Sequence, residues 1–217
     1  MGKGRQHAGA VLIALGSVLV VSCAVLFLLD RRESAKAKQT AEQELVKVEN
    51  TVQERIREND KNKDKETAAE SGTDSISEPP FMGRIKRMPV AEIDGFDYIG
   101  YLSIPSIDLK LPVINTYDEL RLSFAPCRYY GSLETDDLVI AGHNYYGTFN
   151  ELSLVSPGDE VTFTNMDGEV FRYIVGETEV LGPLQVTDMI ESEWELTLYT
   201  CNYSGSARFT VRCILAE

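Results

Sequence analysis

The chain has 217 residues, of which 43% are hydrophobic and 25% are charged, so it is too rich in apolar residues to be a disordered polypeptide. Its formal net charge is −13, and most of this charge lies in residues 81–217, where 21 Asp and Glu oppose 9 Lys and Arg. Nucleic-acid binding requires a basic surface that neutralises phosphates, so we exclude it. Two His and four Cys, without C-x-x-C or H-x-x-x-H spacing, also exclude a His-rich zinc site.

The first segment has the composition of a membrane anchor. Residues 8–29 carry no charged side chain, and a helix of this length reaches about 33 Å, enough to cross a hydrocarbon core of about 30 Å. We therefore expect residues 1–30 to form a cytoplasmic tail and an uncleaved transmembrane anchor. Two alternatives stay open, namely a cleaved signal peptide and a lipoprotein signal in which Cys23 carries the lipid.

Residues 31–80 are expected to form a charged stalk that is partly helical or disordered. Apolar residues recur at helical spacing, namely Leu45, Val48, Val52 and Ile56. This spacing predicts an amphipathic, solvent-exposed helix over about 34–58. Residues 59–80 contain no large apolar residue except Ile76, which predicts a disordered linker.

Residues 81–217 are expected to form a mainly β catalytic domain. Short segments with alternating or β-branched and aromatic residues predict strands, and turn residues separate them. The predicted strands are 99–104, 109–114, 138–142, 160–164, 170–175, 195–200 and 207–215. Short helices are predicted near 118–123 and 149–155. Many short strands of this kind favour a sandwich or a closed barrel.

Two of the predicted strands end in reactive residues. Ala141-Gly-His-Asn144 closes one, Thr197-Leu-Tyr-Thr-Cys201 closes another, and Arg208 begins the last. A thiolate can attack a carbonyl carbon, an imidazole can exchange the protons, and a guanidinium can bind the oxygen as it becomes negative. Each residue alone is common in structural roles, and the combination suggests nucleophilic catalysis.

These motifs, in the order His, Cys, Arg, resemble those of the sortases, cysteine transpeptidases of mostly Gram-positive bacteria, over about residues 96–217. The resemblance implies a closed eight-stranded β-barrel with short helices and a layout of class D or a class B-like member. It implies that Cys201 is the nucleophile, His143 the general acid/base, and Arg208 the oxyanion and substrate-positioning group. Arg212 is the alternative arginine, because it lies four residues on and on the same strand face.

The resemblance also implies two substrate-binding residues. Thr200 is expected to offer a hydroxyl contact, and Asn144 to orient the site. Specificity is expected to depend mainly on the loop at 176–194, whose apolar residues could line a groove or cap the barrel.

The implied activity is cleavage of an LPxTG-like sorting signal after its Thr, followed by transfer of the surface protein to an amine. The amine acceptor would be a cell-wall precursor or a pilin Lys. The alternatives are a cysteine protease that hydrolyses the same acyl-enzyme and a non-catalytic surface barrel that binds peptides.

Such an enzyme acts outside the cell, which implies a single-pass protein in the cell membrane with an extracellular catalytic domain. Arg31, Arg32, Lys36 and Lys38 outnumber Lys3 and Arg5, so the positive-inside rule by itself favours the opposite orientation.

The sequence leaves two further questions open, a disulfide and a metal site. Cys127 and Cys213 are either separate core residues or a disulfide, which an extracytoplasmic domain would permit. We expect no cofactor and assign no metal ligand, with a Ca²⁺ site as the alternative. That site would use the acidic residues of two loops, Glu134, Asp136, Asp137, Glu191, Glu193 and Glu195.

Overall fold

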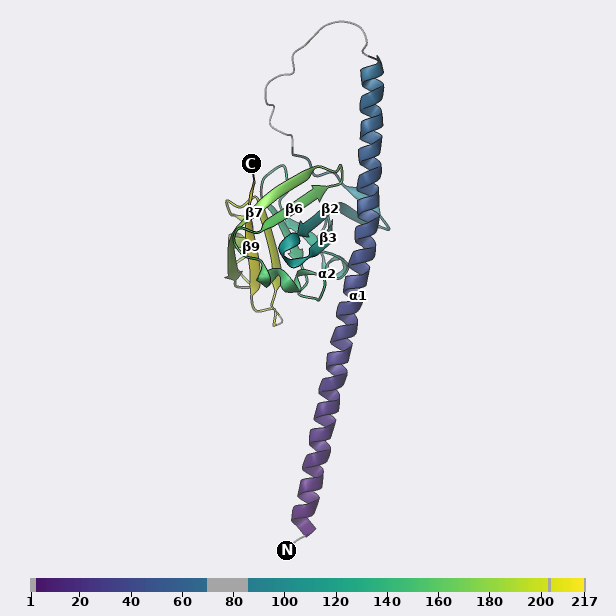
Figure 1. Cartoon of the computed structure of the whole chain (residues 1–217). Helices are drawn as coiled ribbons and strands as arrows, with labels where there is room; N and C mark the ends of the chain where they lie inside the picture. The colour runs from purple at the N-terminus through teal and green to yellow at the C-terminus, as the bar shows by residue number, and fades with distance from the viewer. Residues whose placement is uncertain (1–2, 70–85, 203, 217) are drawn as a thin grey trace. The chain divides into compact units, whose positions relative to one another are not determined.

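The computed structural model describes residues 3–69, 86–202 and 204–216. The chain divides into two compact units, Met1–Lys36 and Ala37–Glu217. The helix α1 (Lys3–Ala69) begins in the first unit and continues into the second, which also holds all the strands (Figure 1).

The second unit is a closed β-barrel. Its nine strands are β1 (Ala91–Ile93), β2 (Phe96–Ile104), β3 (Leu109–Ile114), β4 (Cys127–Tyr130), β5 (Leu138–Gly142), β6 (Glu160–Asn165), β7 (Val170–Leu181), β8 (Leu196–Cys201) and β9 (Arg208–Leu215). They follow the order β1-β2-β3-β4-β5-β8-β9-β7-β6, and β6 pairs back to β2. This last pairing closes a ring of eight strands, β2 to β9, with β1 added outside it as a hairpin on β2. The expected eight-stranded barrel is confirmed.

Gly100 makes the closure possible. It lies in β2 where that strand pairs with β3 on one side and β6 on the other, and its φ is +145°. A Cβ atom at this position would lie 1.9 Å from the carbonyl oxygen of Thr164 in β6. Only glycine allows the two backbones to approach this closely.

The short helices lie between the strands. They are η1 (Pro105–Ile107), α2 (Glu119–Leu122), η2 (Phe149–Leu154) and α3 (Val186–Ile190). The predicted helices near 118–123 and 149–155 are confirmed as α2 and η2. The Asp118 side chain caps α2 by accepting a hydrogen bond of 2.7 Å from the backbone N–H of Arg121.

The strand residues form two apolar layers because side chains alternate between the two faces of a strand. The inner layer fills the barrel and includes Leu102, Phe163, Leu198 and Val211. The outer layer includes Tyr98, Val139 and Tyr199, and it is covered by Val48 and Val52 of α1 and by Met189 of α3.

The middle of α1 lies against the barrel, in contrast to the expected solvent-exposed stalk. Ala41, Val48 and Val52 are fully buried or nearly so. Polar contacts border this stripe: Glu44 accepts a hydrogen bond of 3.0 Å from the Tyr98 hydroxyl, Lys47 pairs with Asp94 at 2.5 Å, and Arg55 pairs with Asp167 at 3.5 Å. The amphipathic pattern was read correctly, but its partner is the outer apolar layer of the barrel.

The helix also extends further than expected. It reaches Ala69, whereas a disordered linker was predicted from residue 59. Residues 59–69 are mainly Lys, Asp, Glu, Asn and Ala without Gly or Pro, so nothing in this stretch breaks the helix. Residues 70–80 of the predicted linker lie outside the described residues, and the divisions at residues 30 and 80 remain predictions.

The expected membrane span falls only in part on described side chains. Those of residues 8–14 lie outside the described set. Among the described residues, no helix is both long and apolar enough to cross a membrane.

Candidate active site

Cys201 and Arg208 form a directly opposed pair next to the turn of the β8–β9 hairpin. The two strands are antiparallel, and Cys201↔Arg208 is the last pair of their register. In the turn that joins them, the backbone N–H of Asn202 donates a hydrogen bond of 2.9 Å to the backbone carbonyl of Ala207. The Asn202 side chain also accepts from the Ala207 N–H at 3.2 Å. The short connection therefore fixes the thiol and the guanidinium on neighbouring positions of one sheet face.

His143 follows β5, the strand next to β8. These strands are parallel, and their register ends at Gly142↔Thr200, so His143 is aligned with Cys201. Neighbouring strands lie about 4.8 Å apart. The backbone carbonyl of His143 accepts hydrogen bonds from the Thr148 hydroxyl at 2.7 Å and the Phe149 N–H at 3.0 Å. Its imidazole stacks on Tyr145, with ring centroids 4.6 Å apart.

The electrostatic surroundings of His143 favour the neutral imidazole. Burial lowers the pKa of His143 because the protonated ring loses hydration, and the nearby Glu119 carboxylate offsets part of this effect. A neutral imidazole can accept a proton at neutral pH, as a general base must.

The two arginines of β9 have different environments. Arg212 is only 2% exposed, and hydrogen bonds to Glu179, Thr197, Asp188 and Met189 engage its guanidinium. By contrast, the Nη1 of Arg208 is buried with no hydrogen-bond partner among the described residues. A buried donor without a partner is costly unless a ligand completes it.

Arg208 also lines a narrow pocket on the outer face. The remaining walls are Tyr129, Gly182, Pro183, Gln185, Val186, Met189 and Tyr199. Its volume is about 10 Å³, roughly the space of one water molecule. In this conformation the pocket is therefore too small for a side chain.

Comparison with known proteins places the chain in a family. The family model of the sortase domain matches residues 102–216, more than half of the chain. The chain belongs to the sortase family. The predicted family is thereby confirmed, while the class within it remains a prediction.

Individual relatives of this sortase are distant. Sortase A of Bacillus anthracis is 27% identical over 116 residues, which are 51% of this chain and 55% of that protein, so the match spans little more than half of the relative. Sortase C1 from Streptococcus agalactiae is 25% identical with a TM-score of 0.50, covering 58% of this chain and 71% of that chain. Sortase A from Corynebacterium diphtheriae is 26% identical with a TM-score of 0.49, covering 56% and 62%.

The two expected substrate-binding residues of this sortase occupy different positions relative to Cys201 and His143. Thr200 pairs with Phe209 on the inner side of the barrel wall, opposite to the side that carries Cys201. It is 5% exposed, and its hydroxyl has no hydrogen-bond partner among the described residues. Asn144 is half-buried and directly follows His143. Strand alternation therefore turns the Thr200 side chain away from the thiol, whereas Asn144 is next to the site through its position in the chain.

Sequence reasoning did not single out three tyrosines beside the site. The rings of Tyr117 and Tyr129 meet edge to face at 5.2 Å, and those of Tyr129 and Tyr199 at 5.4 Å. Tyr199 lies two residues before Cys201 on the same face of β8, so strand alternation could have placed it beside the nucleophile. Nothing in the sequence signals the positions of the other two.

The remaining cysteines of the barrel are separate core residues. Cys127 and Cys213 are both free and buried, and they belong to the outer and inner apolar layers respectively. Burial raises the pKa of both thiols to about 12. They are therefore protonated at neutral pH and unsuited to nucleophilic attack.

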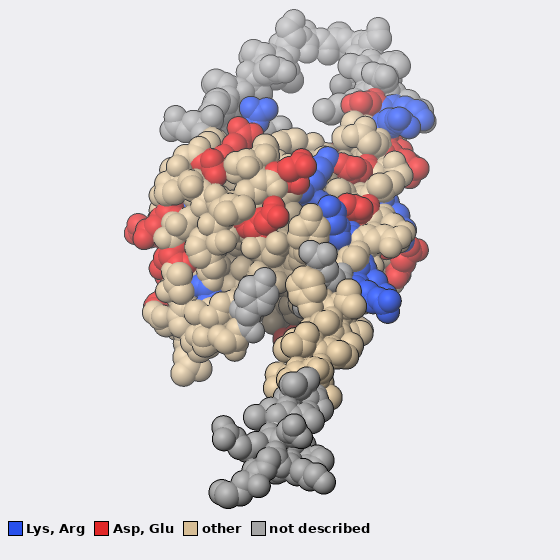
Figure 2. Space-filling model, turned by 60° about the horizontal axis from the view of Figure 1, so that its bottom comes forward, with Lys and Arg blue, Asp and Glu red and all other residues tan. Residues whose placement is uncertain are grey.

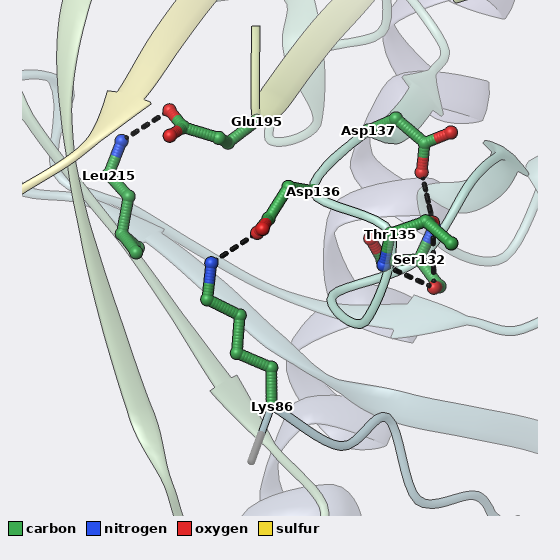
Figure 3. A network of polar contacts seen from close by, with 7 residues as sticks. All are labelled: Lys86, Ser132, Thr135, Asp136, Asp137, Glu195 and Leu215. Atoms are coloured by element: carbon green, nitrogen blue, oxygen red, sulfur yellow. Dashed lines mark hydrogen bonds and ion pairs between the residues drawn. The ribbon is translucent and has the colours of Figure 1, made fainter. Parts of the chain in front are cut away.

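The acidic loops considered for Ca²⁺ are largely occupied by other contacts (Figure 3). Asp136 forms an ion pair with Lys86, and Asp137 accepts a hydrogen bond of 3.1 Å from the Ser132 N–H. Glu134 accepts from the Met88 N–H at 2.7 Å, and Glu195 accepts from the Leu215 N–H at 2.8 Å. Within residues 3–69, 86–202 and 204–216, no three His, Cys, Asp or Glu side chains form a group that could hold a metal ion. The structure gives the calcium alternative no support.

Proposed function

We propose that this sortase is a cysteine transpeptidase that cleaves an LPxTG-like sorting signal after its Thr and transfers the surface protein to an amine acceptor. The observation that carries the proposal is the alignment of Cys201 with both Arg208 and His143 at one end of the barrel. The net negative charge of residues 81–217 is compatible with an amine-bearing acceptor, and Figure 2 shows Asp and Glu interspersed with Lys and Arg on one face of the molecule.

In the proposed first step, neutral His143 takes the proton of the Cys201 thiol and becomes an imidazolium, and the sulfur attacks the carbonyl carbon of the substrate Thr. The unpartnered Nη1 of Arg208 donates to the oxygen as it becomes negative. When the C–N bond breaks, the imidazolium of His143 gives its proton to the leaving amine. The products are a thioester on Cys201 and a free C-terminal peptide.

In the second step, the acceptor amine attacks the thioester carbonyl. Neutral His143 takes the proton from the amine, and Cys201 leaves as the thiolate. The new bond is an amide between the substrate Thr and the acceptor. Water in place of the amine would give hydrolysis, so the same residues would also serve a protease.

The test uses the full chain in detergent with a panel of sorting-signal peptides, each with and without a small amine such as triglycine. Mass spectrometry is expected to find an acyl group on Cys201 and an amine-ligated product, and Cys201→Ala is expected to form neither. Hydrolysis products at every amine concentration would favour the protease. An unmodified Cys201 with every peptide would contradict the enzyme proposal.

We also propose that residues 8–29 anchor the protein in the cell membrane, with the barrel outside. This proposal is supported by the uncharged 22-residue stretch and by the extracellular role of the family. The full chain is expected to float with lipid vesicles in a density gradient, and a chain that starts at Ala37 is expected to stay at the bottom. Cys23→Ala distinguishes a lipoprotein from a transmembrane anchor in the same flotation experiment. Only a chain that is anchored by a lipid on Cys23 would lose membrane binding on this change.

A further inference from the structure

Arg212 joins elements that are distant in the sequence. Its Nε donates to Glu179 of β7 at 2.7 Å, and its Nη1 donates to the hydroxyl of Thr197 in β8 at 3.0 Å. Two more bonds reach backbone carbonyls in α3, from Nη1 to Met189 at 3.2 Å and from Nη2 to Asp188 at 2.6 Å. A single guanidinium therefore links β7, β8 and β9 to α3.

The helix α3 has little stability of its own. It contains five residues, and its N-terminal residue Gln185 provides no side-chain cap. Helices this short are marginal in water, and their last carbonyl groups have no partner within the helix. Arg212 supplies donors to two of these carbonyls, while Met189 is buried against the outer layer.

The position of α3 determines the shape of the pocket beside Arg208. Val186 and Met189 of α3 line it together with Tyr199 and Arg208. Arg212 itself does not line the pocket. Any displacement of α3 would therefore change the space next to Arg208.

We propose that Arg212 is a positioning residue that sets the affinity for substrate by holding the C-terminal end of α3 against the barrel. The part concerning substrate rests on the proposed function, because it assumes that the sorting signal binds beside α3 and Arg208. The tethering of α3 stands independently of it. Arg212 is the alternative catalytic arginine of the sequence analysis. Its four hydrogen bonds to protein acceptors favour a structural role in holding α3.

The test compares Arg212→Lys with Thr197→Val in the full chain. An ammonium cannot reach Glu179 and both carbonyls in the planar geometry of the guanidinium, whereas Thr197→Val removes one acceptor outside α3 and leaves the bonds to Glu179 and to both α3 carbonyls. Amide hydrogen exchange in residues 182–191 is expected to accelerate about tenfold or more in Arg212→Lys and to stay unchanged in Thr197→Val. With a sorting peptide, Arg212→Lys is expected to raise KM about tenfold and change kcat less than about twofold.

Two results would overturn the proposal. Unchanged hydrogen exchange in residues 182–191 of Arg212→Lys would show that Arg212 does not hold α3 against the barrel, whether or not any peptide is processed. A lower kcat at unchanged KM would place Arg212 in the chemistry instead. If circular dichroism shows that Arg212→Lys does not fold, Glu179→Gln takes its place, and it must show a smaller acceleration in the same segment for the proposal to stand.

Discussion

Arg208 and Arg212 share one face of β9, yet only Arg208 retains a buried nitrogen that lacks a partner among the described residues. Arg208→Lys is therefore expected to lower kcat/KM for acylation by about 100-fold, because an ammonium cannot place two parallel donors on a developing oxyanion. Stopped-flow or mass-spectrometric measurement of the acylation rate checks this. The melting temperature is expected to remain near that of the wild type.

The opposite pattern would reassign the catalytic arginine. If Arg208→Lys acylates normally while Arg212→Lys lowers kcat about 100-fold at unchanged KM, the oxyanion role belongs to Arg212. The distinction matters because strand alternation alone places both side chains on the face that carries Cys201.

The buried position of His143 predicts its titration. The midpoint is expected below 6.5, since burial disfavours the imidazolium, and it is expected to fall further in Glu119→Gln, which removes the carboxylate that raises it. NMR titration of the His143 ring measures both shifts, and Glu151→Gln is a control on the neighbouring helix η2. A midpoint in Glu119→Gln equal to or above that of the wild type would contradict the assigned influence of Glu119.

The lowered pKa of His143 also makes the stability of the fold depend on pH. The folded state binds the proton less tightly than the unfolded chain, so protonation favours unfolding. The contribution of His143 to the free energy of unfolding is fully present above its pKa in the unfolded chain, about 6.5. This contribution is lost as the pH falls through the lower pKa of the folded state.

At the scale of elements, the strand end that carries His143 depends on a contact between β5 and η2. A Cβ atom on Gly142 would lie 2.4 Å from the ring of Phe149, which is fully buried. Gly142→Ala is expected to lower the free energy of unfolding by about 1–3 kcal/mol, because the ring must move within a packed core. Urea denaturation followed by fluorescence measures the change.

The double mutant identifies the cause. Phe149→Ala removes every ring atom that the new Cβ would meet, so Gly142→Ala combined with Phe149→Ala is expected to cost less than the sum of the two single changes. Additive losses would mean that Gly142 matters for its backbone conformation instead of its contact with Phe149.

The sequence predicted those elements whose signal is local. Alternating residues located β5 and β8, and the motifs at their ends located His143 and Cys201. The strands β1 and β4 have only three and four residues, too few for a periodic pattern. Helix α3 depends on hydrogen bonds from Arg212 to backbone carbonyls, which leave no trace in the side-chain pattern. The roles of the site residues themselves remain predictions.

At the scale of the whole molecule, the amphipathic stripe of α1 was visible in the sequence but its partner was not. A helical period shows which face is apolar, and it does not show whether solvent, a second helix or a sheet covers that face. In the structure, Val48 and Val52 cover the outer layer of the barrel near Tyr98. The segment expected to be a spacer is thus part of the folded unit that carries the active site.

Two neighbouring valines of α1 provide a matched test of this docking. Val48 is fully buried, whereas Val46, two residues earlier, is 56% exposed. Val48→Ala is expected to lower the free energy of unfolding of the barrel by about 1–3 kcal/mol, because it opens a cavity beneath the helix. Val46→Ala is expected to stay within about 0.5 kcal/mol, since alanine favours the helix and no contact is lost. Equal effects of the two changes on urea denaturation of the barrel would mean that α1 does not support the barrel in solution.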